Sequence, residues 1–148
     1  ARYKNAQTLT AVAVELTVDD AANVHLDRVF IAADSGEVID ADGLQAQLEG
    51  GFMQAASWAL HEQVTYDRDG ISSRDWETYP ILKFDNVPEI EVRLLGRAGD
   101  KPLGAGETSS GPSVAAIANA IHDATSLRLR RMPFSPDAIR AAAMADDG

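Results

Sequence analysis

The chain has 148 residues, 45% of them hydrophobic and 24% charged, so it can bury a core without the help of a metal or a disulfide. Its 23 acidic and 13 basic residues give a net charge of −10, which repels nucleic-acid backbones and argues against a nucleic-acid partner. Because cysteine is absent, this chain excludes a catalytic thiol and any cysteine-bound zinc or iron–sulfur centre. No stretch approaches the roughly 20 apolar residues of a membrane span.

Alternating apolar residues predict three strands. Residues 9–18 place Val12, Val14, Leu16 and Val18 on one face, which is typical of a half-buried strand. Residues 24–33 follow a short turn and are predicted to be its hairpin partner. Residues 89–95 predict a third strand, and residues 63–73 predict a small hairpin around Asp69-Gly70.

Helical spacing predicts three helices between and after these strands. The longest covers residues 42–62 and shows one apolar face, made of Leu44, Leu48, Phe52, Ala55 and Ala59. A second begins near Pro112, with Ser110 or Gly111 as its cap, and a third begins near Ser135. Strands and helices are mixed without a regular βαβ alternation. The sequence therefore predicts one two-layer α+β domain over residues 1–148.

The long helix contains two adjacent glycines, Gly50 and Gly51, next to Gln47 on its second face. Each glycine inside a helix costs about 1 kcal/mol relative to alanine, so another group is expected to approach the backbone here. One interpretation is close packing against a neighbouring strand. The other is a polar ligand or cofactor that lies against Gln47 across the gap that the glycines leave.

The stretch GAGETSSGP places a single carboxylate, Glu107, in the glycine-rich loop that precedes the second helix. In the first interpretation Glu107 caps the helix or orders the loop, because an anion is stabilised near a helix N-terminus. In the second it is a general base, which glycines allow a substrate to approach. The residue pattern does not choose between the two.

Other polar groups give weaker signals. His25, His61 and His122 lack the spacing of metal ligands, so no metal site is expected in this chain. The basic run at residues 128–134, RLRRMPF, is interpreted either as a charged edge segment that favours solubility or as a docking surface.

A resemblance covers nearly the whole chain. The segments ARYKN, AVAVELTVD, QLEGGFMQAASWAL, GAGE and AAIANAIHDATSLRLRRMPFSPDAI follow one another as in the C-terminal part of the molybdopterin-binding large subunit of molybdenum hydroxylases. This is the xanthine dehydrogenase and aldehyde oxidoreductase superfamily, and the isoquinoline 1-oxidoreductase and nicotinate dehydrogenase type is most similar. One departure is Ser126, where relatives usually carry glycine, and we expect it to affect only a turn.

The resemblance implies roles for both unusual features. Glu107 looks like the family's catalytic base, which would deprotonate a hydroxo ligand on molybdenum during the oxidation of an N-heteroaromatic compound or an aldehyde. The expected cofactor is a molybdenum–pterin, of the molybdopterin cytosine dinucleotide type. The residues that would contact it are Gln47, Gly104, Gly106, Ser109 and Ser110.

The resemblance also implies partners. The family holds its cofactor between this region and a preceding glycine-rich part of the same subunit, which is not in this sequence, and its 2Fe-2S clusters lie on a small subunit. The chain opens without methionine, so we expect it to be a C-terminal fragment that is inactive alone. Such a fragment should expose apolar surface where the missing half docks. The expected source is a bacterial enzyme of the cytoplasm, and the periplasm is the alternative compartment. The alternative is a catalytically incomplete module that only binds a partner subunit or stabilises an assembly.

Overall fold

The computed structural model describes residues 1–4 and 8–146, so Asn5 of the ARYKN segment lies outside the described residues. Four strands form the main sheet in the order β1-β2-β3-β6. They are β1 (Arg2–Lys4), β2 (Leu9–Val18), β3 (Val24–Asp34) and β6 (Glu89–Leu94). β2 is antiparallel to β1 and β3, whereas β6 runs parallel to β3. The three long strands agree with the sequence prediction, and the short β1 was not predicted.

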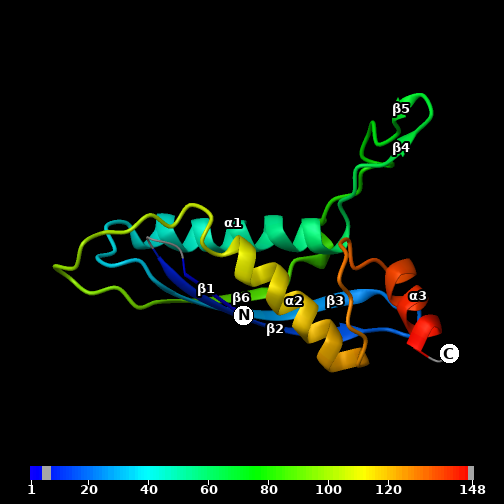
Figure 1. Cartoon of the computed structure of the whole chain (residues 1–148). Coiled ribbons are helices and arrows are strands. Elements are labelled where there is room, and N and C mark those ends of the chain that lie inside the picture. Colours follow the sequence, from blue (N-terminus) through cyan, green and yellow to red (C-terminus); the bar gives the residue numbers. More distant parts are fainter. Residues whose placement is uncertain (5–7, 147–148) are drawn as a thin grey trace.

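Two helices lie across one face of this sheet, and a third lies at its far end (Figure 1). They are α1 (Ala41–Leu60), α2 (Ser110–Thr125) and α3 (Pro136–Asp146). α2 packs on β2, and α1 packs between α2 and β6. The two-layer α+β prediction is therefore confirmed.

The core lies between the sheet and the two helices. Its largest fully buried hydrophobic side chains are Val29, Ile31, Leu48, Phe52, Ile117 and Ile121. α1 buries Leu48 and Phe52 from the apolar face that the sequence predicts, and α2 buries Ile117 and Ile121, which lie four residues apart on one of its faces. Burying each such side chain contributes about 1.5–3 kcal/mol, so these faces fix how the helices sit on the sheet.

A tight turn joins β2 to β3. The Asp19 carboxylate accepts hydrogen bonds from the side chain and main chain of Asn23, from the amide of Ala21 and from the His25 ring. The side-chain bond from Asn23 is the largest cause that lowers the pKa of Asp19, to about 2, because these donors stabilise the charged carboxylate.

An arm, residues 63–83, leaves the body between α1 and β6 (Figure 1). It carries the strands β4 (Tyr66–Asp67) and β5 (Gly70–Ile71), and the 3-10 helix η1 (Phe84–Asn86) follows at its return. The predicted hairpin is present, but its two connecting residues are Arg68 and Asp69, one position earlier than expected.

The connections around α2 correct two predictions. α2 begins at Ser110 with Ser109 as its N-cap, earlier than the predicted start near Pro112, and Ser109 makes no side-chain capping bond. At the other end Ser126 adopts a left-handed conformation with φ of 62°, the geometry in which glycine is favoured. The basic run that follows is not a sheet edge, because residues 126–135 form no strand.

None of the helices in residues 1–4 and 8–146 combines the length and the hydropathy that a membrane-spanning helix needs.

Candidate functional site

The glycine-rich loop before α2 is tied to two distant elements by its main-chain carbonyls. The Gln47 side chain on α1 donates from Nε2 to the carbonyl of Gly106 at 2.6 Å. The hydroxyl of Thr8, just before β2, donates to the carbonyl of Gly104 at 2.5 Å. The structure therefore brings together Gln47 and the GAGE segment, the two features that the sequence singled out separately.

Two hydroxyl contacts at the end of the loop fix its junction with the helix. Thr10 on β2 and Thr108 share a buried hydrogen bond of 2.5 Å between their hydroxyl oxygens. The Ser109 hydroxyl, also buried, donates to the carbonyl of Leu48 at 3.0 Å. Sequence reasoning missed Thr10, although it shares the inward face of β2 with Val12. A polar side chain at a core-facing position needs a partner, and that was the available signal.

The adjacent glycines of α1 turn out to have different surroundings. A Cβ at Gly51 would lie 2.3 Å from the Ser109 hydroxyl oxygen, so the N-terminus of α2 approaches the backbone of α1 there. A Cβ at Gly50 would meet nothing within 4 Å. Close packing explains Gly51, but the neighbour is a helix end and not the strand that one interpretation proposed. Gly50 faces open space.

Glu107 lies in the turn that leads into α2, and its side chain is exposed. Its main-chain carbonyl accepts from the amide of Ser110 at 3.3 Å. Within residues 1–4 and 8–146, its carboxylate makes no hydrogen bond or ion pair, so it does not cap α2. The loop conformation consequently depends on the main chain of Glu107 and not on its acid group.

One patch combines the exposed groups of this region. Gln47 and Gly50 are neighbours three residues apart on α1, and the amide of Gln47 reaches Gly106. A Cβ at Gly106, like one at Gly50, would meet no atom within 4 Å. Bare backbone beside a primary amide and a free carboxylate suits a large polar cofactor that approaches from outside this chain. Ser110 is half-buried at the edge of the patch, whereas the Ser109 hydroxyl is committed to Leu48.

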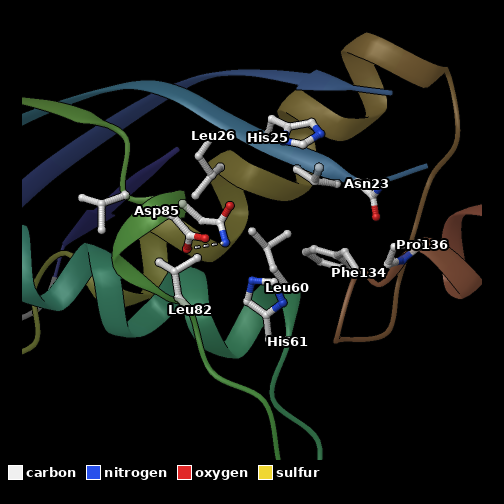
Figure 2. A pocket seen from close by; sticks show the side chains of 12 residues that line it. Asn23, His25, Leu26, Leu60, His61, Leu82, Asp85, Phe134 and Pro136 are labelled. Carbon is white, nitrogen blue, oxygen red and sulfur yellow. Dashed lines mark hydrogen bonds between the residues drawn. The ribbon is translucent and has the colours of Figure 1, made fainter. Parts of the chain in front are cut away.

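A hollow lies away from this patch, at the opposite end of α1, and includes neither Glu107 nor Gln47. It is a cavity of about 300 Å³ between the start of β3, the end of α1 and the returning limb of the arm (Figure 2). Apolar walls from Leu26, Leu60, Leu82 and Phe134 meet the polar side chains of Asn23, His25, His61, Asp85 and Asn86. Burial lowers the pKa of His61, because the charged imidazolium is poorly solvated there.

Comparison with known proteins identifies similar sequences. Residues 2–88 match the model of a molybdopterin cofactor-binding domain. The chain is 42% identical over 119 residues to a nicotinate dehydrogenase polypeptide of Pseudomonas putida, and this match covers 80% of the chain and 10% of that protein. It is 34% identical to an isoquinoline 1-oxidoreductase polypeptide of Brevundimonas diminuta, over 90% of the chain and 17% of that protein.

The fold also has a solved counterpart. Quinoline 2-oxidoreductase from Pseudomonas putida 86 superposes with a TM-score of 0.86 at 24% identity, over 93% of this chain and 19% of that chain. The chain thus spans less than a fifth of the length of each of these proteins.

Proposed function

The chain belongs to the molybdopterin cofactor-binding domain family, and from this premise we propose that it is the part of a molybdenum hydroxylase that carries the catalytic base. The observation that supports the proposal is the bond from Gln47 to the Gly106 carbonyl, which joins positions 59 residues apart. Gln47 on α1 thereby lies beside the loop that bears Glu107, which supports a shared role for the two residues.

In this proposal most residues of the patch hold the cofactor, and one residue, Glu107, accepts a proton. Gln47, Gly104 and Gly106 would hold the pterin with amide and backbone groups, and the helix end at Ser110 would contribute its polar groups. Ser109 would act indirectly, since its hydroxyl keeps the helix end against Leu48. When bound, the molybdenum–pterin supplies a Lewis-acidic metal that accepts two electrons while water provides the oxygen.

Glu107 would accept a proton at a carboxylate oxygen as the general base. A base must reach its proton, and the exposed side chain, which no group of the described chain holds back, meets this requirement. The anchored loop would keep the carboxylate in a constant position from one turnover to the next, because the loop is fixed through its carbonyls.

We propose an N-heteroaromatic compound or an aldehyde as the substrate, since the relatives include enzymes named for nicotinate and isoquinoline. The proposed cofactor form is molybdopterin cytosine dinucleotide. The proposed partners are the rest of the large subunit and a small subunit that carries 2Fe-2S clusters. The proposal also holds that the isolated chain is inactive.

The test replaces Glu107 by glutamine in the complete enzyme. We expect kcat/KM to fall by about 10²–10⁴-fold, because an amide cannot take the proton, while molybdenum and pterin contents stay unchanged. The matched variant Gln47→Ala should show the opposite pattern, with less cofactor per protein and smaller losses per bound cofactor. Full turnover by Glu107→Gln would refute the assignment of the base.

A further inference from the structure

The arm, residues 63–83, projects from the body beyond the end of α1 (Figure 1). Large hydrophobic side chains along the arm are exposed, including Tyr66 at 72% and Trp76 at 77%. The others are Val64, Ile71 and Ile81. A monomeric protein rarely gathers so many apolar side chains on one exposed segment, and such a patch is typical of a surface that another polypeptide covers.

Polar contacts within the arm give it a defined shape. The Thr65 hydroxyl bonds with those of Ser72 and Ser73, and Arg74 Nε donates to the carbonyl of Ile71 at 2.7 Å. The Thr78 hydroxyl donates to the Asp75 carboxylate at 2.8 Å. Because these polar bonds shape the arm, its exposed apolar side chains are left available for a partner.

The root of the arm is fixed to α1 and continues the apolar surface. Tyr79 donates to the Glu62 carboxylate at 2.7 Å, and the amide of Leu82 donates to the Ser57 hydroxyl at 3.0 Å. Phe84, just past the root, is 99% exposed, and Leu82 and Asp85, on either side of it in the chain, line the cavity of Figure 2. A rigid root next to a cavity with apolar walls suits a partner that inserts a side chain there.

We propose that the arm and its root dock onto a separately folded part of the same large subunit, outside residues 1–148. This inference rests on the proposed function, since it requires the chain to be part of a longer subunit. The comparisons favour this occupant: the quinoline enzyme contains this fold within a chain of which only 19% is matched. The unmatched 7% of the present chain amounts to about ten residues, fewer than the arm contains, so part of the arm has a counterpart inside that longer polypeptide.

Charge argues against a second copy of the chain as the occupant. Each copy carries a net charge of −10, so two copies repel each other at low ionic strength. A domain of the same polypeptide is held close by the covalent link, so its docking does not depend on protein concentration as the association of two copies does.

The test uses the complete enzyme as purified, with a photoreactive benzophenone amino acid in place of Trp76. We expect crosslinks to peptides of the same subunit outside residues 1–148, and amide exchange of the arm at least about tenfold slower than in the Trp76→Asp variant of the same enzyme. Crosslinks to a second copy or to the small subunit, an absence of crosslinks, or a purified protein of only these 148 residues would each overturn the proposal.

Two variants serve as test and control. In the complete enzyme Trp76→Asp should speed arm exchange at least about tenfold, whereas Met144→Asp, at a residue 79% exposed on α3, should leave the protection unchanged. None of these measurements requires turnover or bound molybdenum. A protected arm together with full turnover by Glu107→Gln would therefore refute the proposed base and leave the docking inference standing.

Discussion

Gly50 and Gly51 offer a paired test of how the loop of Glu107 is positioned. Replacing either by alanine raises helix propensity by about 0.8–1.0 kcal/mol, and this gain is common to both variants. At Gly50 nothing opposes it, because the new Cβ would meet no atom within 4 Å. Gly50→Ala should therefore stabilise the chain by close to that amount.

At Gly51 the same methyl would lie 2.3 Å from the Ser109 hydroxyl oxygen, which must then move. That hydroxyl is buried and bonded to the Leu48 carbonyl at 3.0 Å. Breaking the bond costs about 1 kcal/mol, and leaving the buried hydroxyl without a partner raises the cost to about 1–3 kcal/mol. We therefore expect Gly51→Ala to gain nothing or to lose up to about 2 kcal/mol, after the propensity gain is included.

The assay is urea denaturation of both variants, of Ser109→Ala and of the double variant Gly51→Ala/Ser109→Ala, which completes a double-mutant cycle. The double variant removes the oxygen that the methyl would strike, so part of the loss should return as a coupling energy of about 1 kcal/mol or more. The two glycine variants should differ in melting temperature by about 2–4 °C for each kcal/mol that separates them. Equal stabilisation by Gly50→Ala and Gly51→Ala would refute the close approach of α2 to α1.

Three further predictions follow from single contacts. Ser126→Gly should raise the free energy of unfolding by about 0.5–1 kcal/mol in urea titrations, because φ of 62° is strained for serine; Ser126→Ala should bring no gain. Thr10→Val should cost about 1–3 kcal/mol by leaving the buried Thr108 hydroxyl unpaired, whereas the double variant with Thr108→Val should be close to neutral by calorimetry. Asp19 has a folded pKa of about 2, below its ordinary value of 3.8, so its stabilisation is present above that value and is lost as pH falls through about 2. Asp19→Asn should remove this part of the acid dependence when melting temperature is measured against pH.

The strands and helices could be predicted because their causes are local. The alternation around Val12 and the helical spacing of Leu48 and Phe52 record which face each element buries, and the structure buries those faces. The ordered set of segments that includes QLEGG and GAGE predicted the family, which the comparison with known domains confirms.

What could not be predicted depends on contacts between residues far apart in the chain. Gly51 falls three residues after Leu48, toward the apolar face of α1, but only the path of α2 shows that Ser109 is the group that reaches it. The partnership of Thr10 with Thr108 joins positions 98 residues apart, so no local window contains both. The hairpin of the arm was visible in the sequence, but its departure from the body was not, because the turn residues carry no information about what the hairpin packs against.

The way the loop is anchored makes Glu107 unusually suitable for a functional test. Its neighbours hold the loop through the carbonyls of Gly104 and Gly106 and through the hydroxyls of Thr108 and Ser109. The Glu107 carboxylate takes part in none of these bonds, so Glu107→Gln should change the free energy of unfolding by no more than about 0.5 kcal/mol. A loss of turnover in that variant can therefore be assigned to the missing proton acceptor. A variant at Thr10 would instead shift the loop and change binding and turnover together. Unchanged stability in Glu107→Gln is therefore the condition for reading its kinetics as chemistry.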